Sequence, residues 1–220
     1  MLLDETHALL MQTASNFKYN ESIDFFTVRD QIRTLGIGYF PDEPFGEENI
    51  HTNKNSLLLQ EPNQFASLIT FLANQKCESF CEIGVFQGWS TLLIAAVLSR
   101  KNKNLKIHGI DPYSSPNEQV RSIFKIMNID YEHHFCDAAD VKEMKFDITL
   151  IDGNHIYEYV QNDWENIGKH SKICIFHDVT NKFANDHNGG PERFFKELKG
   201  TKILFSSKTH VMGIGIIILQ

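Results

Sequence analysis

The chain has 220 residues with 42% hydrophobic and 22% charged residues, as expected of one large globular domain that needs no disulfides. Its formal net charge of −7 argues against a nucleic-acid partner, because such proteins usually present a basic face. The longest uncharged stretch is too short and polar for a membrane span, and the four cysteines form no CxxC pair, so we expect a cytoplasmic protein without membrane partners.

Residues 1–60 differ in pattern from the rest of the chain. Two helix-like stretches, over 5–15 and 22–35, precede a loop over 36–46 that is rich in glycine and proline. We expect this region to be a helical segment with a lid over the substrate side. The main domain is expected to occupy 61–220.

From residue 61 onward, helical and extended patterns alternate. Helices are predicted over 65–72, 90–98, 117–127, 157–167 and 192–198, and strands over 79–84, 105–110, 131–136, 146–151, 172–176, 202–206 and 212–219. This order predicts an α/β fold of Rossmann type, with a mostly parallel seven-stranded sheet and helices on both faces. The last two strands leave no room for a crossover helix and should form an antiparallel hairpin.

The segment Cys-Glu-Ile-Gly-Val-Phe-Gln-Gly-Trp-Ser, over 81–90, joins the first predicted strand to a helix. Gly84 and Gly88 permit a tight turn and a close approach to a ligand, and Ser90 could cap the helix. Their spacing is not the GxGxxG pattern that serves a pyrophosphate, and no P-loop lysine follows. A turn with a purely structural role is the alternative.

An acid follows the second predicted strand, 23 residues after Gly88. In folds of this type such a carboxylate accepts hydrogen bonds from the hydroxyls of an adenosine ribose, so Asp111 is a candidate cofactor ligand. The signal is weak alone, since strands often end in aspartate, and becomes strong beside the glycine segment.

Acids and histidines also follow the fourth and fifth predicted strands. Asp152 and His155 stand after the fourth strand, and His177 and Asp178 after the fifth. Because parallel strands end at one edge of the sheet, these four side chains should converge in the ligand crevice. His155 is the candidate general base, because histidine can accept a proton near neutral pH.

The glycine segment resembles the E-x-G-x-x-x-G-x-S form of the first motif of class I S-adenosylmethionine-dependent methyltransferases. The later segments resemble D-G-x-H-x-Y and the following acid of small-molecule and sugar O-methyltransferases, a branch that includes macrolide-sugar O-methyltransferases and cephalosporin-hydroxylase-like proteins. The resemblance covers about residues 60–220. It implies a cofactor site formed by Glu82, Gly84, Gly88, Ser90, Asp111 and Asp137, the last at the adenine amino group.

The resemblance also implies a divalent cation. Asp152 and Asp178 become its ligands, with Mg²⁺ favoured by the hard oxygen donors. Several relatives have a glutamate where this chain has His177. A nitrogen ligand would shift the preference toward Mn²⁺, Fe²⁺ or Zn²⁺, or His177 would not bind the metal at all. Asp152 is also assigned to the catalytic machinery together with His155.

The predicted reaction is transfer of the methyl group of S-adenosylmethionine to a hydroxyl of a small acceptor, with a sugar as one candidate. Two alternatives come from other classes: a non-catalytic Rossmann-like binding protein and a nicotinamide-dependent oxidoreductase. The glycine spacing and the terminal hairpin speak against the oxidoreductase. The identity of the acceptor and the oligomeric state, a homo-oligomer among the options, stay open.

Overall fold

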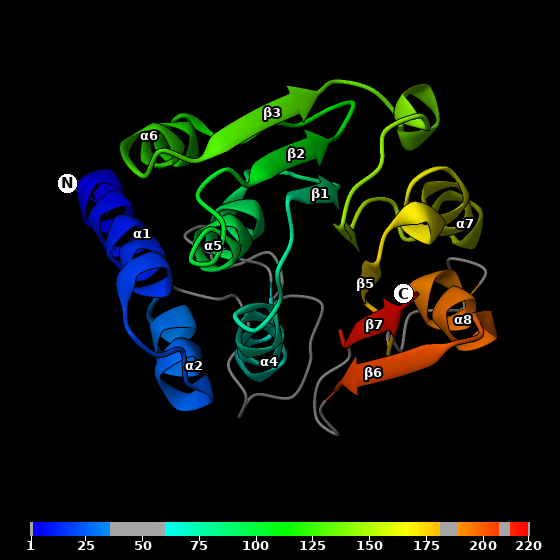
Figure 1. Ribbon diagram of the computed structural model, residues 1–220, viewed down its shortest axis with the longest axis horizontal. Helices are drawn as coiled ribbons and strands as arrows, with labels where there is room; N and C mark the ends of the chain where they lie inside the picture. The colour runs from blue at the N-terminus through cyan, green and yellow to red at the C-terminus, as the bar shows by residue number, and fades with distance from the viewer. Residues whose placement is uncertain (1, 36–59, 181–188, 207–211, 220) are drawn as a thin grey trace.

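The computed structural model describes residues 2–35, 60–180, 189–206 and 212–219 of the chain. Seven strands form one sheet in the order β3-β2-β1-β4-β5-β7-β6 (Figure 1). The strands are β1 (Ser79–Ile83), β2 (Lys106–Ile110), β3 (Asp130–His134), β4 (Ile148–Ile151), β5 (Ile173–His177), β6 (Thr201–Phe205) and β7 (Ile214–Ile218). The first five run parallel, whereas β7 is antiparallel to both β5 and β6. The predicted sheet and its terminal hairpin are confirmed.

Helices cover both faces of this sheet (Figure 1). One face carries α4 (Pro62–Leu72), α5 (Trp89–Leu98) and α6 (Glu118–Ile126), and the other carries α7 (Tyr157–Asn166) and α8 (Gly190–Glu197). Two short 3₁₀ turns, Ala138–Val141 and Gly168–His170, escaped the sequence analysis because a single turn has no periodicity to detect. No helix of the described residues is long and apolar enough to cross a membrane.

The helices begin where side chains can satisfy their first amides. Asn117 accepts a hydrogen bond from the amide of Val120 and starts α6, and Glu61 accepts one from Gln64 and starts α4 ahead of Pro62. Helix α5 is apolar on every side, and it is enclosed between the sheet, α1 and α4. This enclosure explains why a helix without a polar face is stable here.

The N-terminal helices α1 (Leu2–Tyr19) and α2 (Phe25–Thr34) pack outside α5 and α4, respectively. Their buried side chains, Phe17 and Ile32 among them, belong to the same hydrophobic cluster as α4, α5 and α6. Arg100, after α5, donates a hydrogen bond of 2.9 Å to the carbonyl of Phe17 and so caps the C-terminus of α1. Residues 36–59, which hold the expected lid, lie outside the described residues, and the division at residue 60 stays a prediction.

The order of the strands indicates where the ligand crevice lies. The chain proceeds from β1 outward to β3, then returns to place β4 on the other side of β1. In open α/β sheets, ligands bind at the carboxyl edge beside such a reversal. The loops after β1 and β4 are therefore the first place to look for a site.

The packing of α1 gives a testable prediction. Phe17→Ala should lower the free energy of unfolding by about 3–5 kcal/mol, because it removes a fully buried ring from the shared core. Tyr19→Ala, in the same helix but at a position 66% exposed, should change it by less than about 0.5 kcal/mol. Urea denaturation of both variants is the measurement. Equal effects would show that α1 does not share the core.

Candidate functional site

The loop 84–88, which we call the glycine loop, turns sharply between β1 and α5. Gly84 and Gly88 have φ angles of +89° and +81°, a conformation that favours glycine. A Cβ on Gly84 would lie 2.2 Å from the carbonyl oxygen of Asp152, and one on Gly88 would lie 2.8 Å from Cβ of Pro116. Both glycines are therefore required by packing, whatever ligand the loop receives.

Glu82 is completely buried in β1, and its carboxyl accepts hydrogen bonds from two residues of α5. The donors are the hydroxyls of Ser90, at 2.6 Å, and Thr91. Burial raises the pKa of Glu82 to about 8, against the opposing effect of these hydroxyls. Ser90 does not cap α5, contrary to expectation: Gly88 holds the N-cap position, and the Ser90 hydroxyl turns toward Glu82 instead.

Asp111, after β2, holds two loops together. One carboxylate oxygen accepts the amides of Val85 and Phe86, at 3.0 and 3.1 Å. The other accepts the amides of Tyr113 and Ser114, at 2.9 and 2.8 Å. All the usual acceptor positions of the carboxylate are thus occupied by backbone donors. Asp111 orients the glycine loop directly, and a ribose would have to share or displace these bonds.

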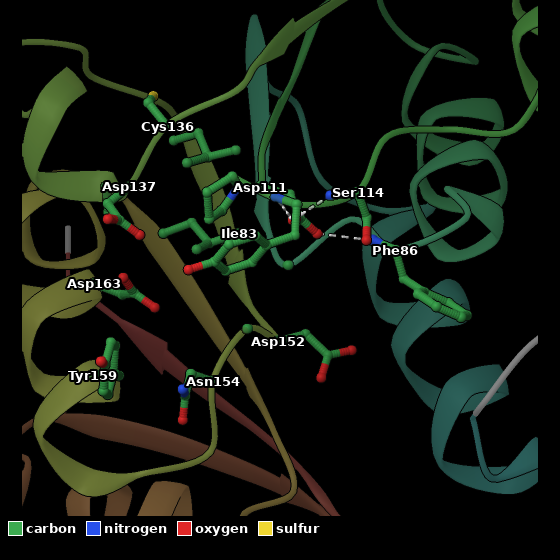
Figure 2. Close-up of a pocket in the computed structure, with 16 residues that line it drawn as sticks. Ile83, Phe86, Asp111, Ser114, Cys136, Asp137, Asp152, Asn154, Tyr159 and Asp163 are labelled. Carbon is green, nitrogen blue, oxygen red and sulfur yellow. Dashed lines mark hydrogen bonds between the residues drawn. The ribbon is translucent and has the colours of Figure 1, made fainter.

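A cavity of about 450 Å³ opens between these loops, within the usual size range of small-molecule sites (Figure 2). We call it the strand-edge cavity. The glycine loop and Asp111 border it on one side, and the turn after β3 and the start of α7 border the other. Of the predicted cofactor residues, Gly84, Asp111 and Asp137 line this cavity, whereas Glu82, Gly88 and Ser90 do not.

Two further carboxyls face the strand-edge cavity away from the glycine loop. Asp137 is exposed at the start of the 3₁₀ turn after β3, and Asp163 projects from α7. Figure 2 shows both side chains directed into the same part of the cavity. Asp163 is only 8% exposed, and burial, followed by the charge of Asp137, raises its pKa to about 7.

The polar residues after β4 and β5 converge, as the sequence analysis expected. We call Asp152, His155, His177 and Asp178 the histidine–aspartate cluster. His177 Nδ1 lies 3.1 Å from Asp152 and 3.6 Å from Asp178. The His155 ring lies between the same two carboxylates, with Nδ1 3.2 Å from Asp178 and Nε2 3.6 Å from Asp152. Asp152 also lines the strand-edge cavity, so the cluster adjoins it.

The two histidines and two aspartates compensate one another electrically. Burial alone would raise the pKa of Asp152, but the neighbouring His177 and His155 lower it below its ordinary value. Burial likewise opposes the charged form of His177, yet Asp152 and Asp178 raise its pKa well above the ordinary value. Asp178 adopts a left-handed backbone conformation with φ +58°, unusual for a residue with a side chain and typical of functional sites.

Two residues of this region escaped the sequence analysis as site residues. Gln60 is buried ahead of α4 and donates a hydrogen bond of 3.2 Å to Asp152. No local pattern marks this glutamine, because its partner is 92 residues away. Asp163 belongs to none of the motifs described above. Its place in the helix that follows His155 could have indicated a side chain facing the crevice.

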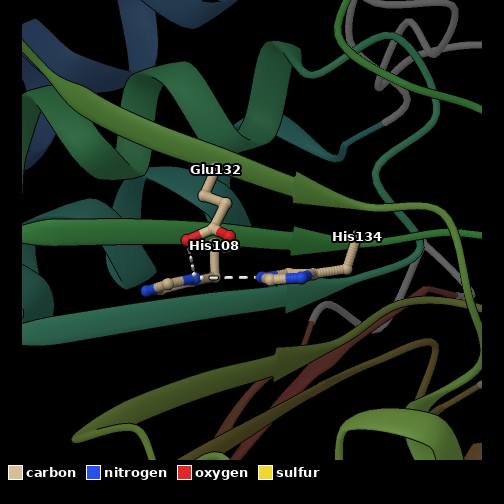
Figure 3. Close-up of side chains that lie close together, drawn as sticks. All are labelled: His108, Glu132 and His134. Atoms are coloured by element: carbon tan, nitrogen blue, oxygen red, sulfur yellow. Dashed lines mark hydrogen bonds and ion pairs between the residues drawn. The ribbon is translucent and has the colours of Figure 1, made fainter.

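A second group of metal-type ligands, His108, Glu132 and His134, lies on β2 and β3 (Figure 3). His108 Nδ1 lies 3.1 Å from His134 Nε2, the ring planes are inclined by only 15°, and the ring centroids are 5.4 Å apart. These values place the two nitrogens on the line between the rings, which is the geometry of an N–H···N hydrogen bond. Lone pairs that bind one metal would converge at an angle instead. The structure therefore favours a hydrogen-bonded pair.

Residues 81–179 match the sequence model of a family described as a methyltransferase domain. The match starts within β1 and ends just after β5, so it includes the glycine loop, Asp111, the strand-edge cavity and the histidine–aspartate cluster. We find no curated protein with a significant sequence match to the chain.

Solved structures of O-methyltransferases share the fold. TomG from Streptomyces achromogenes, involved in tomaymycin synthesis and solved with S-adenosylmethionine, is 19% identical, with a TM-score of 0.55 over 75% of this chain and 83% of TomG. An O-methyltransferase from Bacillus cereus, solved with S-adenosylhomocysteine, is 15% identical, with a TM-score of 0.53 over 98% of this chain and 91% of that chain. Residues 81–179 thus match a methyltransferase domain, and the chain shares the fold of these O-methyltransferases, which confirms the predicted fold.

Proposed function

We propose that the chain binds S-adenosylmethionine in the strand-edge cavity and transfers its methyl group to a hydroxyl of a small acceptor, with a sugar as one candidate. The observation that carries this proposal is the position of the cavity. It lies between the glycine loop and two acidic side chains, and Asp152 joins it directly to the histidine–aspartate cluster. A cofactor held there would have its reactive end beside candidate proton acceptors.

When bound, S-adenosylmethionine supplies an electrophilic methyl group, whose carbon–sulfur bond breaks with the electron pair left on sulfur as the acceptor oxygen attacks. The residues of the chain orient the acceptor and take its proton. His155 suits the second task because its side chain is 34% exposed and reaches the crevice. Its Nδ1, 3.2 Å from Asp178, can donate to that carboxylate, which leaves Nε2 to receive the hydroxyl proton.

The histidine–aspartate cluster also fits a divalent cation. Ligand atoms of Asp152, His155 and His177 lie within 4.8 Å of one another, and Asp178 adds a second carboxylate. His177 Nδ1 lies 3.1 Å from Asp152 and 3.6 Å from Asp178, close to the roughly 2.9–3.4 Å expected between ligand atoms at about 2.0–2.1 Å from one small cation. A cation held by Asp152, Asp178 and His177, Mg²⁺ or Mn²⁺ by donor type, would supply Lewis acidity beside the acceptor hydroxyl.

Calorimetry with S-adenosylhomocysteine, NAD and NADP tests the proposed cofactor. We expect only the first to bind, and Asp111→Ala to weaken it by about 1–3 kcal/mol, because the glycine loop loses its charged anchor. The same variant should also unfold more easily, since four backbone amides lose their acceptor. Binding of NAD in place of S-adenosylhomocysteine would favour the oxidoreductase. Binding of neither ligand would favour a non-catalytic protein.

Replacement of His155 tests the proposed base. His155→Ala should reduce methyl transfer by about 10²–10⁴-fold and leave the affinity for S-adenosylhomocysteine nearly unchanged, because the side chain does not line the strand-edge cavity. His170→Ala, at an exposed position outside the crevice, is the control. Turnover of His155→Ala within tenfold of wild type would assign the proton to another acceptor, with His177 the next candidate.

If the histidine–aspartate cluster binds a cation, removal of one of its carboxylate charges should abolish metal binding. Asp178→Asn should abolish the binding of Mn²⁺ seen by calorimetry with the wild-type protein, while S-adenosylhomocysteine still binds. Asp30→Asn, an exposed acid in α2, should keep both ligands. If the wild-type protein binds no divalent cation and its turnover survives EDTA, the cluster works as an ion-paired network without metal.

A further inference from the structure

Asp163 is a buried carboxyl without an assigned partner. It is more than nine-tenths buried, and no donor among the described residues forms a hydrogen bond or ion pair with it. Charged groups are rarely buried in this way unless they are paired or change protonation. Its side chain lines the strand-edge cavity, so a ligand in that cavity is the natural partner.

The surroundings of Asp163 favour its acid form. The charged group that acts on it is Asp137, which faces the same part of the cavity (Figure 2). The thiols of Cys81 and Cys174, buried beneath α7, stay neutral because burial raises their pKa well above the ordinary value. No cation of the described residues offsets this negative charge. Burial and like charge both raise the pKa of Asp163, to about 7, and so favour its acid form.

An acid and a carboxylate side by side offer one donor and one acceptor. Adenine presents the complementary pattern, because its 6-amino group donates and the adjacent ring nitrogens accept. The exposed Asp137 is the natural acceptor for the amino group. A second carboxylate at Asp163 would instead face the lone pair of a ring nitrogen, and the two would repel each other.

We propose that Asp163, in its acid form, donates a hydrogen bond to a ring nitrogen of the adenine while Asp137 accepts one from the 6-amino group. This inference rests on the proposed function, since it presupposes S-adenosylmethionine in the strand-edge cavity. It makes Asp163 a residue that determines specificity for the adenine ring of the cofactor. It also couples cofactor binding to a proton.

The proton on Asp163 makes the affinity for S-adenosylhomocysteine depend on pH in one direction. Below pH 7 Asp163 already carries its proton, and S-adenosylhomocysteine binds without proton exchange. Above pH 7 the free protein has lost this proton and must take it up again on binding. The affinity should therefore fall as pH rises, by at least about fivefold between pH 6 and pH 8.5. Calorimetry at pH 8 in buffers of different ionisation enthalpy should detect uptake of about one proton per site.

Asp163→Asn is the decisive variant. The amide keeps the shape of the acid and a permanent donor but does not titrate, so affinity at pH 6 should stay within about threefold while the proton uptake disappears. Asp163→Leu, which has no donor, should bind about tenfold more weakly at pH 6. Asp30→Asn, an exposed acid in α2 that does not line the cavity, should behave as wild type.

Analogues of S-adenosylhomocysteine that lack one ring nitrogen test the contact itself. The 1-deaza or the 7-deaza analogue should bind the wild-type protein about tenfold more weakly than S-adenosylhomocysteine does. The same analogue should bind Asp163→Leu as well as S-adenosylhomocysteine does, because this variant already lacks the donor. Proton uptake that persists in Asp163→Asn, or equal penalties in both proteins, would overturn the proposal. Failure of the wild-type protein to bind S-adenosylhomocysteine at all would instead overturn the proposed function.

Discussion

The close contact between Gly84 and the carbonyl of Asp152 is the constraint on which the site depends. The ends of β1 and β4 approach so closely that a single added carbon would lie 2.2 Å from a backbone oxygen. The amide of Asp152 completes the contact with a hydrogen bond of 2.9 Å to Ile83. Because the glycine loop follows β1, and Asp152 and His155 follow β4, this contact fixes the cavity beside the histidine–aspartate cluster. A site built on strand ends is held more firmly than one built on long loops.

The carboxyl groups of the site have different roles because their surroundings differ. Glu82, fully buried, accepts hydroxyls and anchors α5, whereas Asp111 accepts four amides and shapes the loops that border the cavity. Asp152 is compensated by two histidines. Asp163 has no such compensation in the described structure, and its pKa rises as a result. The same functional group thus serves as an anchor, a charge partner or a proton donor because burial and neighbours differ.

The N-terminal helices contribute to the site indirectly. α1 and α2 enclose α5 and α4, so the helix that carries the glycine loop is held on all sides. Gln60, ahead of α4, donates a hydrogen bond to Asp152. The packing of α1 and α2 thus supports the crevice, although none of the described residues before Gln60 lines the strand-edge cavity.

The sequence by itself determined the order and type of the main elements, the parallel sheet, the terminal hairpin and the convergence of Asp152, His155, His177 and Asp178. These features follow from local periodicity and from the rule that parallel strands end at one edge. Only the tertiary structure decided what each side chain contacts. Ser90 turns to Glu82, Asp111 accepts four backbone amides, and Asp163 faces the same part of the cavity as Asp137. Such contacts join residues far apart in the chain, and burial, which sets their chemistry, exists only once the chain has folded.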